Sequence, residues 1–348
     1  MAQMNKPQIA ITMGDPSGVG PETIVGAWRD PAVHAAARPL VVGHPEIMRR
    51  AADLLRADVE VIEISAPEDA RPAPSRIPVL TGCSDDVLSI KPATVDPRCG
   101  RAAYDCVLSA AELALAGRVD AITTAPLNKA AMHRAGIEYP GHTEILAELC
   151  GVDDYAMMLY LRRDHDASRG LGVVHVTLHM ALWDVFSHLS AGAVLAKTRL
   201  IDRVMTDLNG ARPKVGVCAL NPHAGEQGSF GDEEQTMIRP AVVRAREAGI
   251  DVAGPLPADT LLARAAEGDF DAVVAMYHDQ GHIAIKLLDM HRAVNITLGL
   301  PIVRTSVAHG TAFDLAWQGR AKSTGMIEAI GVAARLAAKK SAVVAGTA

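Results

Sequence analysis

The chain has 348 residues, of which 49% are hydrophobic and 21% are charged, and its net charge is −6. A chain of this length and apolar content can build large cores, and we expect about two globular domains. The acidic balance and the lack of a basic patch exclude a protein built to bind nucleic acid or an anionic membrane. A phosphate-bearing ligand must therefore be held by a few placed side chains.

The sequence carries no targeting or cross-linking pattern. The opening stretch MAQMNKPQIAITMGD lacks the apolar core of a signal peptide, and no apolar run reaches the roughly 18 residues of a membrane span. The five cysteines are scattered and form no CxxC pair, which excludes a zinc ribbon and a disulfide framework. We expect a protein of the reducing cytoplasm.

The first expected elements are a strand at residues 9–13 and a glycine-rich turn, GDPSGVGPE (residues 14–22), that leads into a helix. Pro21 suits the first helical turn. The spacing GxxxGxG is neither the Rossmann GxGxxG pattern nor a P-loop. We therefore favour a structural turn or a loop that lines a shared cleft, with phosphate binding as the alternative.

Helices and strands then alternate. We expect strands at residues 39–42, 59–62, 77–80 and 120–124, and helices at residues 47–55 and 100–115. The segment TAPLNKA (residues 124–130) follows the last of these strands, where Asn128 and Lys129 meet an anionic ligand, or Asn128 caps the next helix. In GHTEIL (residues 141–146), Thr143 is a candidate helix cap and His142 lies at a helix N-terminus, which favours an anion.

The second half of the chain repeats one pattern, a strand that ends at a histidine. Strands are expected at residues 156–161 and 172–176, joined by the hairpin-like RRDHDASRG, and at residues 214–219 and 272–276. His179 follows one strand and precedes a helix expected to begin near Trp183. His223 and His278 follow two others, the latter in the polar loop YHDQG (residues 277–281). In open α/β sheets, ligands bind at the carboxyl ends of the strands.

Three neutral imidazoles from separate strand ends can bind one divalent ion and leave positions open for a substrate. Asp259, Asp279 and His142 are companion groups that orient a ligand imidazole or move a proton. The alternative for each histidine is a hydrogen-bonded loop residue. Spacing in the sequence does not show convergence.

Seven motifs, taken in order, resemble the 4-hydroxythreonine-4-phosphate dehydrogenase family of the pyridoxal phosphate pathway, over about residues 8–335. They are GDPSGVGPE, GHTE, VTLHMAL, LNPHAGEQGSFGDEE, GPLPADTL, YHDQG and VNITLGLPIVRTSVAHGTAFDLA. The resemblance implies kinship with the metal-dependent decarboxylating dehydrogenases of isocitrate and isopropylmalate. Their GDGIGPE is similar to GDPSGVGPE, and their adenosine-binding HGSAPDIAGKG is similar to HGTAFDLAWQG (residues 309–319).

The resemblance also assigns residues. It implies that the metal ligands are His179, His223 and His278, shared between the two subunits of a homodimer. The family's substrate-binding positions fall on His142, Thr143, Lys286, Asn295 and Arg304, and its cofactor loop falls on His309, Gly310, Thr311 and Asp314. The two cations suit phosphate and carboxylate groups, the arginine through its bidentate fork.

The implied reaction is an NAD- or NADP-linked oxidation in which a divalent ion, zinc, magnesium or cobalt, lowers the pKa of the substrate's hydroxyl group. The 3-oxo acid formed from 4-phosphohydroxy-L-threonine then loses carbon dioxide. Two departures from the family affect this reading: Ala308 stands where an aspartate is usual, and GHIAIK (residues 281–286) replaces GLPVLK. The second resembles a branch that acts on D-threonate or D-erythronate 4-phosphate, and a further relative oxidises a cis-dihydrodiol dicarboxylate.

The expected fold is α/β, with two α/β/α domains of the isocitrate/isopropylmalate dehydrogenase type and a cleft between them, and not a Rossmann fold. The first domain comprises residues 1–135 and 299–348, on the nucleotide side. The second comprises residues 136–298, with the metal ligands and dimer contacts. A two-domain ligand-binding protein is the non-enzymatic alternative.

Overall fold

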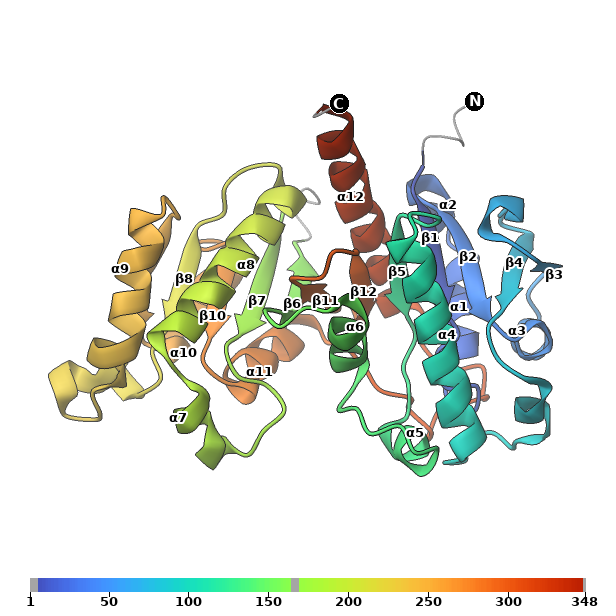
Figure 1. The fold of residues 1–348 in the computed structure, drawn as a ribbon, viewed down its shortest axis with the longest axis horizontal. Coiled ribbons are helices and arrows are strands. Elements are labelled where there is room, and N and C mark those ends of the chain that lie inside the picture. Colours follow the sequence, from blue (N-terminus) through green and yellow to red (C-terminus); the bar gives the residue numbers. More distant parts are fainter. Residues whose placement is uncertain (1–5, 164–168, 347–348) are drawn as a thin grey trace. The chain divides into compact units, whose positions relative to one another are not determined.

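The computed structural model describes residues 6–163 and 169–346 (Figure 1). The first residues of the opening stretch and the middle of RRDHDASRG therefore lie outside the described residues. The chain divides into two compact units, unit 1 (residues 1–152 and 300–348) and unit 2 (residues 153–299). The chain passes from unit 1 to unit 2 after residue 152, later than the expected boundary at residue 135. The reason is that α5 (Lys129–Arg134) and α6 (His142–Cys150) pack on α4 (Pro97–Leu115) in unit 1.

Unit 1 contains a parallel sheet with the strand order β3-β4-β2-β1-β5-β12. Its strands are β1 (Gln8–Thr12), β2 (Arg38–Gly43), β3 (Glu60–Ile64), β4 (Arg76–Thr81), β5 (Ala121–Thr124) and β12 (Arg304–Val307). Its other helices are α1 (Gly20–Trp28), α2 (Pro31–Ala36), α3 (Pro45–Leu54) and α12 (Thr324–Gly346), with the short 3-10 helices η1 (Pro67–Asp69) and η2 (Asp85–Ser89).

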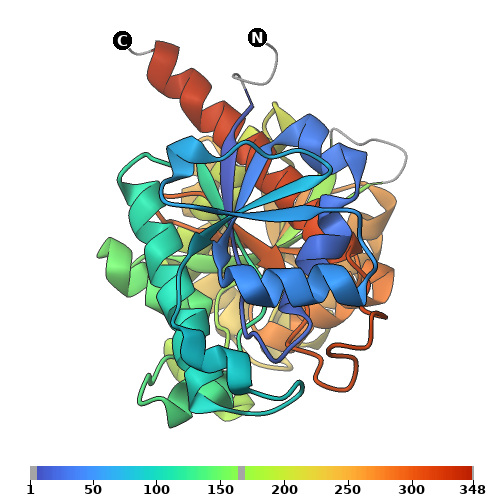
Figure 2. The same ribbon diagram turned by 90° about the vertical axis from the view of Figure 1, so that its right-hand side faces the viewer.

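Alternation along β1 separates two cores. Ile9 and Ile11 pack in a core with residues of α1, α3 and α12, whereas Ala10 packs in a second core with residues of α4. Successive side chains of a strand point to opposite faces, so the sheet is covered on both sides. Figure 2 shows α4 on one side of these strands and the first helices on the other.

Unit 2 contains a mixed sheet with the order β11-β6-β7-β10-β8-β9, antiparallel at β11-β6 and β6-β7 and parallel from β7 to β9. The strands are β6 (Ala156–Arg162), β7 (Gly170–His175), β8 (Val215–Cys218), β9 (Val252–Leu256), β10 (Ala272–Ala275) and β11 (Val294–Leu298). The longer helices are α8 (Ala191–Asn209), α9 (Arg239–Glu247), α10 (Ala258–Glu267) and α11 (His278–Asp289).

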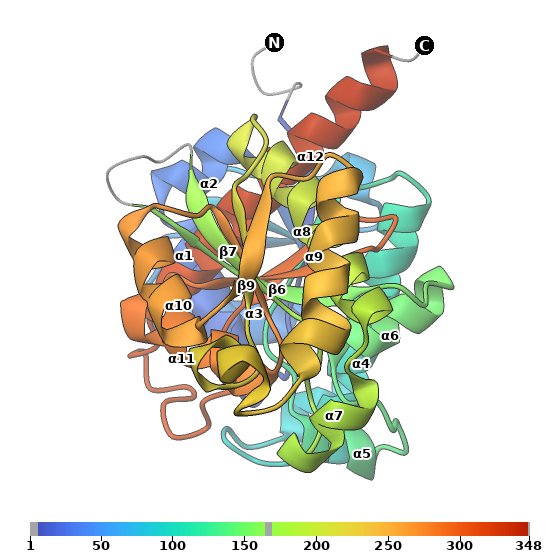
Figure 3. The same cartoon turned by 90° about the vertical axis from the view of Figure 1, so that its left-hand side faces the viewer.

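The unit 2 sheet is also covered on both faces. On β7, Gly172 faces Met205 of α8 and the neighbouring Val173 faces Gly281 of α11. Figure 3 shows α8 and α9 on one side of the strands and α10 and α11 on the other. Both units are therefore α/β/α layers, as the sequence predicts. Among the described helices, none is long and apolar enough to cross a membrane.

The helix expected near Trp183 is present but short: a 3-10 turn, η3 (Leu182–Asp184), leads into a four-residue helix, α7 (Val185–His188), and a long helix starts at Ala191. Two other local predictions were wrong. The segment 277–281 is the first turn of α11 and not a loop. Thr143 does not cap α6, whose N-cap is Gly141, whereas the side chain of Asn128 does cap α5 by accepting from the backbone N–H of Ala131.

Candidate active site

The carboxyl ends of β7 and β10 open into a hollow of unit 2. It encloses about 580 Å³, and its walls include His179, Tyr277, His278 and Asp279. Gln280 fixes the end of β10, because its side chain accepts from the N–H of Met276 (2.7 Å) and donates to the carbonyl of Ala219 (2.8 Å) after β8. The polar residues that follow β10 are thus held on a rigid strand end.

His278 is oriented on two sides. Its Nδ1 donates a 2.7 Å hydrogen bond to Oδ1 of Asp279, which leaves Nε2 as the ring nitrogen available to a ligand. A carboxylate on the second ring nitrogen is the arrangement usual for metal-binding histidines. The ring also stacks on His282, at 3.7 Å between centroids and an interplanar angle of 13°.

Sequence reasoning missed the buried pair His175 and His282. Nε2 of His175 and Nδ1 of His282 are 3.1 Å apart, and Nδ1 of His175 is 3.4 Å from the carbonyl of Met157. Burial lowers the pKa of His175 to about 4 and that of His282 to about 2, so both rings are neutral. The available signal was the repeated HxxxH spacing in HVTLH (residues 175–179) and HDQGH (residues 278–282).

The proposed metal ligands are brought together only in part. The ring centroids of His179 and His278 are 5.8 Å apart, and two imidazoles on one tetrahedral ion lie about 5 Å apart. The separation of these two rings is therefore close to that of two ligands of one ion. No group of three or more His, Cys, Asp or Glu side chains that could hold a metal occurs within residues 6–163 and 169–346 of one chain.

His223 lies in the turn after β8, η4 (Pro222–Gly228), and its ring neighbours Phe230 at 6.3 Å. Residues 223–227 all have positive φ. The chain before the turn is anchored by the buried carboxylate of Glu234, which accepts from the N–H groups of Leu220 (2.8 Å) and Asn221 (2.7 Å). The turn thus has a defined conformation. Within the described part of the chain, however, His223 does not form a metal-binding group with His179 and His278.

The remaining predicted residues of unit 2 lie on three elements. Asp259 is exposed in the first turn of α10, where its carboxylate accepts from the N–H of Thr260 (2.8 Å). Lys286 is half-buried on α11. On β11, Asn295 donates to the sulfur of Met157 (3.2 Å), and its buried Oδ1 has no hydrogen-bond partner among the described residues. That oxygen is an acceptor available to a ligand.

In unit 1, His142 presents a similar vacant acceptor. Burial, with the charges of Arg304 and Lys129 nearby, holds the pKa of His142 well below its usual range. The ring hydrogen-bonds the backbone of Ala125, and its buried Nε2 has no hydrogen-bond partner among the described residues. The side chain is therefore a neutral imidazole with one free nitrogen beside two cations.

Arg304 starts β12 and is 1% exposed. Its Nη2 donates to Oγ1 of Thr124 (2.6 Å), at the end of β5. Burial lowers the pKa of Arg304 to about 9, and the carboxylate of Glu144 opposes that shift. Thr143 is buried beside His142 in the first turn of α6. The guanidinium is thus held at a fixed position in the interior of unit 1.

The glycine-rich turn after β1 packs against the predicted cofactor loop. The N–H of Val19 donates to the carbonyl of Thr311 (3.0 Å), and a Cβ on Gly18 would lie 3.0 Å from that of Thr311. Glu22 accepts hydrogen bonds from the backbone N–H groups of Trp317 and Gly319 (2.9 Å for the latter). The turn therefore supports this loop, on which His309, Gly310, Thr311 and Asp314 are all at least partly accessible.

The mixed α/β fold of the chain resembles that of the β-decarboxylating dehydrogenases. The fold is shared with a β-decarboxylating dehydrogenase of Thermococcus kodakarensis, with a TM-score of 0.53 at 14% identity and coverage of 97% of this chain and 88% of that one. The family model "Pyridoxal phosphate biosynthetic protein PdxA" matches residues 35–333. The chain belongs to this family and is an oxidoreductase of the dehydrogenase type.

Individual relatives carry two different names. A 4-hydroxythreonine-4-phosphate dehydrogenase of Trichlorobacter lovleyi is 48% identical over 96% of this chain and 99% of its own length. A D-threonate 4-phosphate dehydrogenase of Salmonella typhimurium is 45% identical over 96% and 100%. The crystal structure of a 4-hydroxythreonine-4-phosphate dehydrogenase from Klebsiella pneumoniae superposes with a TM-score of 0.84 at 43% identity, covering 95% and 99%. The family is thus shown, and the names of these relatives give two different substrates.

Proposed function

We propose that the protein oxidises 4-phosphohydroxy-L-threonine to the 3-oxo acid, which loses carbon dioxide to give 3-amino-2-oxopropyl phosphate for pyridoxal phosphate biosynthesis. The observation that carries this proposal is the pair of imidazoles in the unit 2 hollow, His179 and His278, with Nδ1 of the latter bonded to Asp279. The family match and the 48% identical relative support the substrate.

His179, His223 and His278 would hold a divalent ion, zinc, magnesium or cobalt, and residues 309–314 would bind NAD or NADP. When bound, the ion supplies Lewis acidity at the hydroxyl that is oxidised, and the nicotinamide accepts the hydride. In the neutral form of His278, the hydrogen bond to Asp279 places the proton on Nδ1 and leaves the lone pair on Nε2, which a ligand nitrogen requires. Asp259 is exposed and is the proposed carboxylate for proton transfer to water.

The substrate is proposed to bind through His142, Thr143, Lys286, Asn295 and Arg304. The free Nε2 of His142 accepts a hydrogen bond or a proton from a substrate hydroxyl, because burial keeps the ring neutral. Oδ1 of Asn295 accepts from a second hydroxyl or amine. Lys286 and Arg304 are the cations for phosphate and carboxylate.

A homodimer is proposed to complete the metal site. Large apolar side chains are exposed in unit 2: Leu182, which lines the hollow, is 65% exposed, its neighbour Trp183 is 86% exposed, and Leu287 on α11 is 82% exposed. Exposed apolar side chains of this size are typical of a surface that another protein covers. A second copy of the chain would also supply the third imidazole, which the described residues of one chain do not bring to the other two. The five free thiols support a cytoplasmic location.

D-threonate or D-erythronate 4-phosphate is the alternative substrate. The 45% identical Salmonella relative supports it, as does His282, the histidine of GHIAIK, which stacks on a proposed metal ligand. The deciding experiment measures kcat/KM from NAD(P)H absorbance on 4-phosphohydroxy-L-threonine, the two sugar-acid phosphates and a cis-dihydrodiol dicarboxylate. The highest value on 4-phosphohydroxy-L-threonine is expected. Preference for a sugar-acid phosphate would establish the alternative, and no NAD(P)H from any of the four would refute the assigned reaction.

A further inference from the structure

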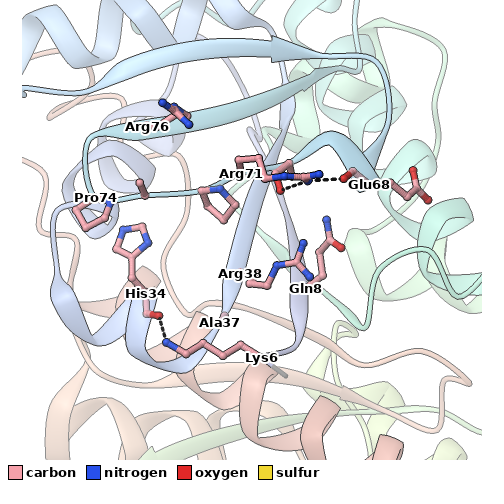
Figure 4. A pocket seen from close by; sticks show the side chains of 12 residues that line it. Lys6, Gln8, His34, Ala37, Arg38, Glu68, Arg71, Pro74 and Arg76 are labelled. Carbon is pink, nitrogen blue, oxygen red and sulfur yellow. Dashed lines mark hydrogen bonds between the residues drawn. The ribbon is translucent and has the colours of Figure 1, made fainter. Parts of the chain in front are cut away.

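A positively charged hollow lies at the amino end of the unit 1 sheet (Figure 4), the edge opposite the glycine-rich turn that follows β1. It encloses about 640 Å³, within the range of sites for small metabolites. Its polar walls come from Lys6, Gln8, Arg38, Glu68, Arg71 and Arg76. None of these residues belongs to the candidate active site.

Two arginines line the hollow from the starts of neighbouring strands. The pairing of β2 with β4 begins at Val41 opposite Val79, and Arg38 and Arg76 each lie three residues before that first pair. Gln8 of β1 lies opposite Arg38, and Glu60 of β3 lies opposite Arg76. Both arginines therefore enter the lining of one hollow from the amino ends of β2 and β4.

The positive charge of the hollow is not compensated from within. Both carboxylate oxygens of Glu68 accept from Arg118 (2.9 and 2.6 Å), which holds the pKa of Glu68 at about 2. Arg71 donates to two backbone carbonyls, at 2.6 and 3.1 Å. The side chains of Arg38 and Arg76 form no hydrogen bond or ion pair with any described residue, and Arg38 is half-buried. The register neighbour Glu60 is exposed on the far side of Arg76.

The other wall of the hollow is apolar. It is formed by small residues of the segment before β4 and of the end of α2, namely Ala37, Ala70, Pro72, Ala73 and Pro74. Figure 4 shows Arg38 of β2, Arg76 of β4 and Pro74 of this segment among the residues that line the hollow. We propose that the hollow binds a small metabolite that carries a phosphate or diphosphate group, held by Arg38 and Arg76, with its uncharged part against the alanine and proline wall.

Binding of inorganic pyrophosphate, measured by titration calorimetry on the full-length protein at constant ionic strength, tests this site. The variant Arg38→Gln/Arg76→Gln removes both arginines, and Arg199→Gln/Arg203→Gln removes two exposed arginines of α8 as a charge-matched control. We expect the pocket variant to lose one pyrophosphate site, or to bind there at least about tenfold more weakly. The control variant should bind like the parent protein, and dehydrogenase activity without pyrophosphate should be the same in all three.

Equal binding by the parent and the pocket variant, or equal loss in both variants, would overturn the proposal. If the double variant is unstable, Arg76→Gln alone, at an exposed position, must still weaken binding severalfold. Sedimentation of the pocket variant gives a second check, because a change in oligomeric state with no change in pyrophosphate binding would show that the arginines hold an acidic segment of another chain instead.

Discussion

Asp279 should control metal affinity without being a ligand. Replacement by asparagine keeps the shape of the side chain and removes the charge that holds Nδ1 of His278 at 2.7 Å. Such partners of metal ligands contribute about 10- to 100-fold to affinity, or about 1.4–2.7 kcal/mol. Asp279 also lies in the first turn of α11, where a negative charge stabilises a helix by about 0.3–1 kcal/mol. Asp279→Asn should therefore lose more metal affinity than folding stability.

The assay is a competition titration of the metal-free protein with cobalt or zinc, beside a measurement of the free energy of unfolding. Glu46→Gln is the matched control, because Glu46 lies in the first turn of α3 and loses the same helix-end charge far from any proposed ligand in sequence. We expect unchanged metal affinity in this control. If Asp279→Asn bound metal as tightly as the parent and lost only the stability that the control loses, the carboxylate would serve the helix end and the proposed orientation of His278 would be wrong.

Three further outcomes are expected. When inactive alanine variants of the three proposed histidine ligands are mixed in pairs and subunits exchange, two of the three pairings should regain activity. The reason is that a site shared by two chains takes two ligands from one chain and one from the other. No recovery in any pairing would place all three ligands in one chain. Gly281→Ala should destabilise the protein by about 1–3 kcal/mol in denaturant titration, because the new Cβ would lie 2.5 Å from Nε2 of His175. Gly331→Ala in α12, where a Cβ would meet nothing within 4 Å, should instead stabilise the protein by about 0.5–1 kcal/mol. The same sign for both changes would refute the packing argument. Burial raises the pKa of Asp15 above its usual 3.8, so the folded protein binds a proton that the unfolded chain has released. The free energy of unfolding therefore falls as pH rises from 3.8 through that raised pKa. Asp15→Asn should remove this part of the pH dependence of unfolding, and an unchanged profile would contradict the reasoning.

The strands were predictable because parallel strands covered on both faces are short apolar runs, and β1, β2, β8 and β10 are of this kind. The helix expected near Trp183 is short, and its apolar residues Leu182, Trp183 and Phe186 are at least half exposed in the chain. An apolar pattern does not tell whether the surface that covers it belongs to the same chain, and here nothing within the described part of unit 2 buries these residues.

The site was predictable one histidine at a time and not as a group. Spacing marked His179, His223 and His278 as residues at strand ends, and the structure brings two of them to one hollow. His223 does not join these two within the described part of one chain, and spacing in the sequence does not show which histidines converge. His142 was placed correctly at the start of α6, but its neutral state depends on burial and on two cations from other segments, and these are products of the fold.

The two HxxxH doublets explain how the unit 2 site is built. In each doublet one histidine is buried, His175 or His282, and these two rings pair at 3.1 Å beneath the strand ends. The other histidine of each doublet, His179 or His278, lines the hollow. Because His278 is held by Asp279 on its edge and by His282 on its face, its ring has little freedom to turn. The buried histidine pair thus helps to fix the direction of the donor nitrogen of His278 before an ion binds, a role that packing alone has in other sites.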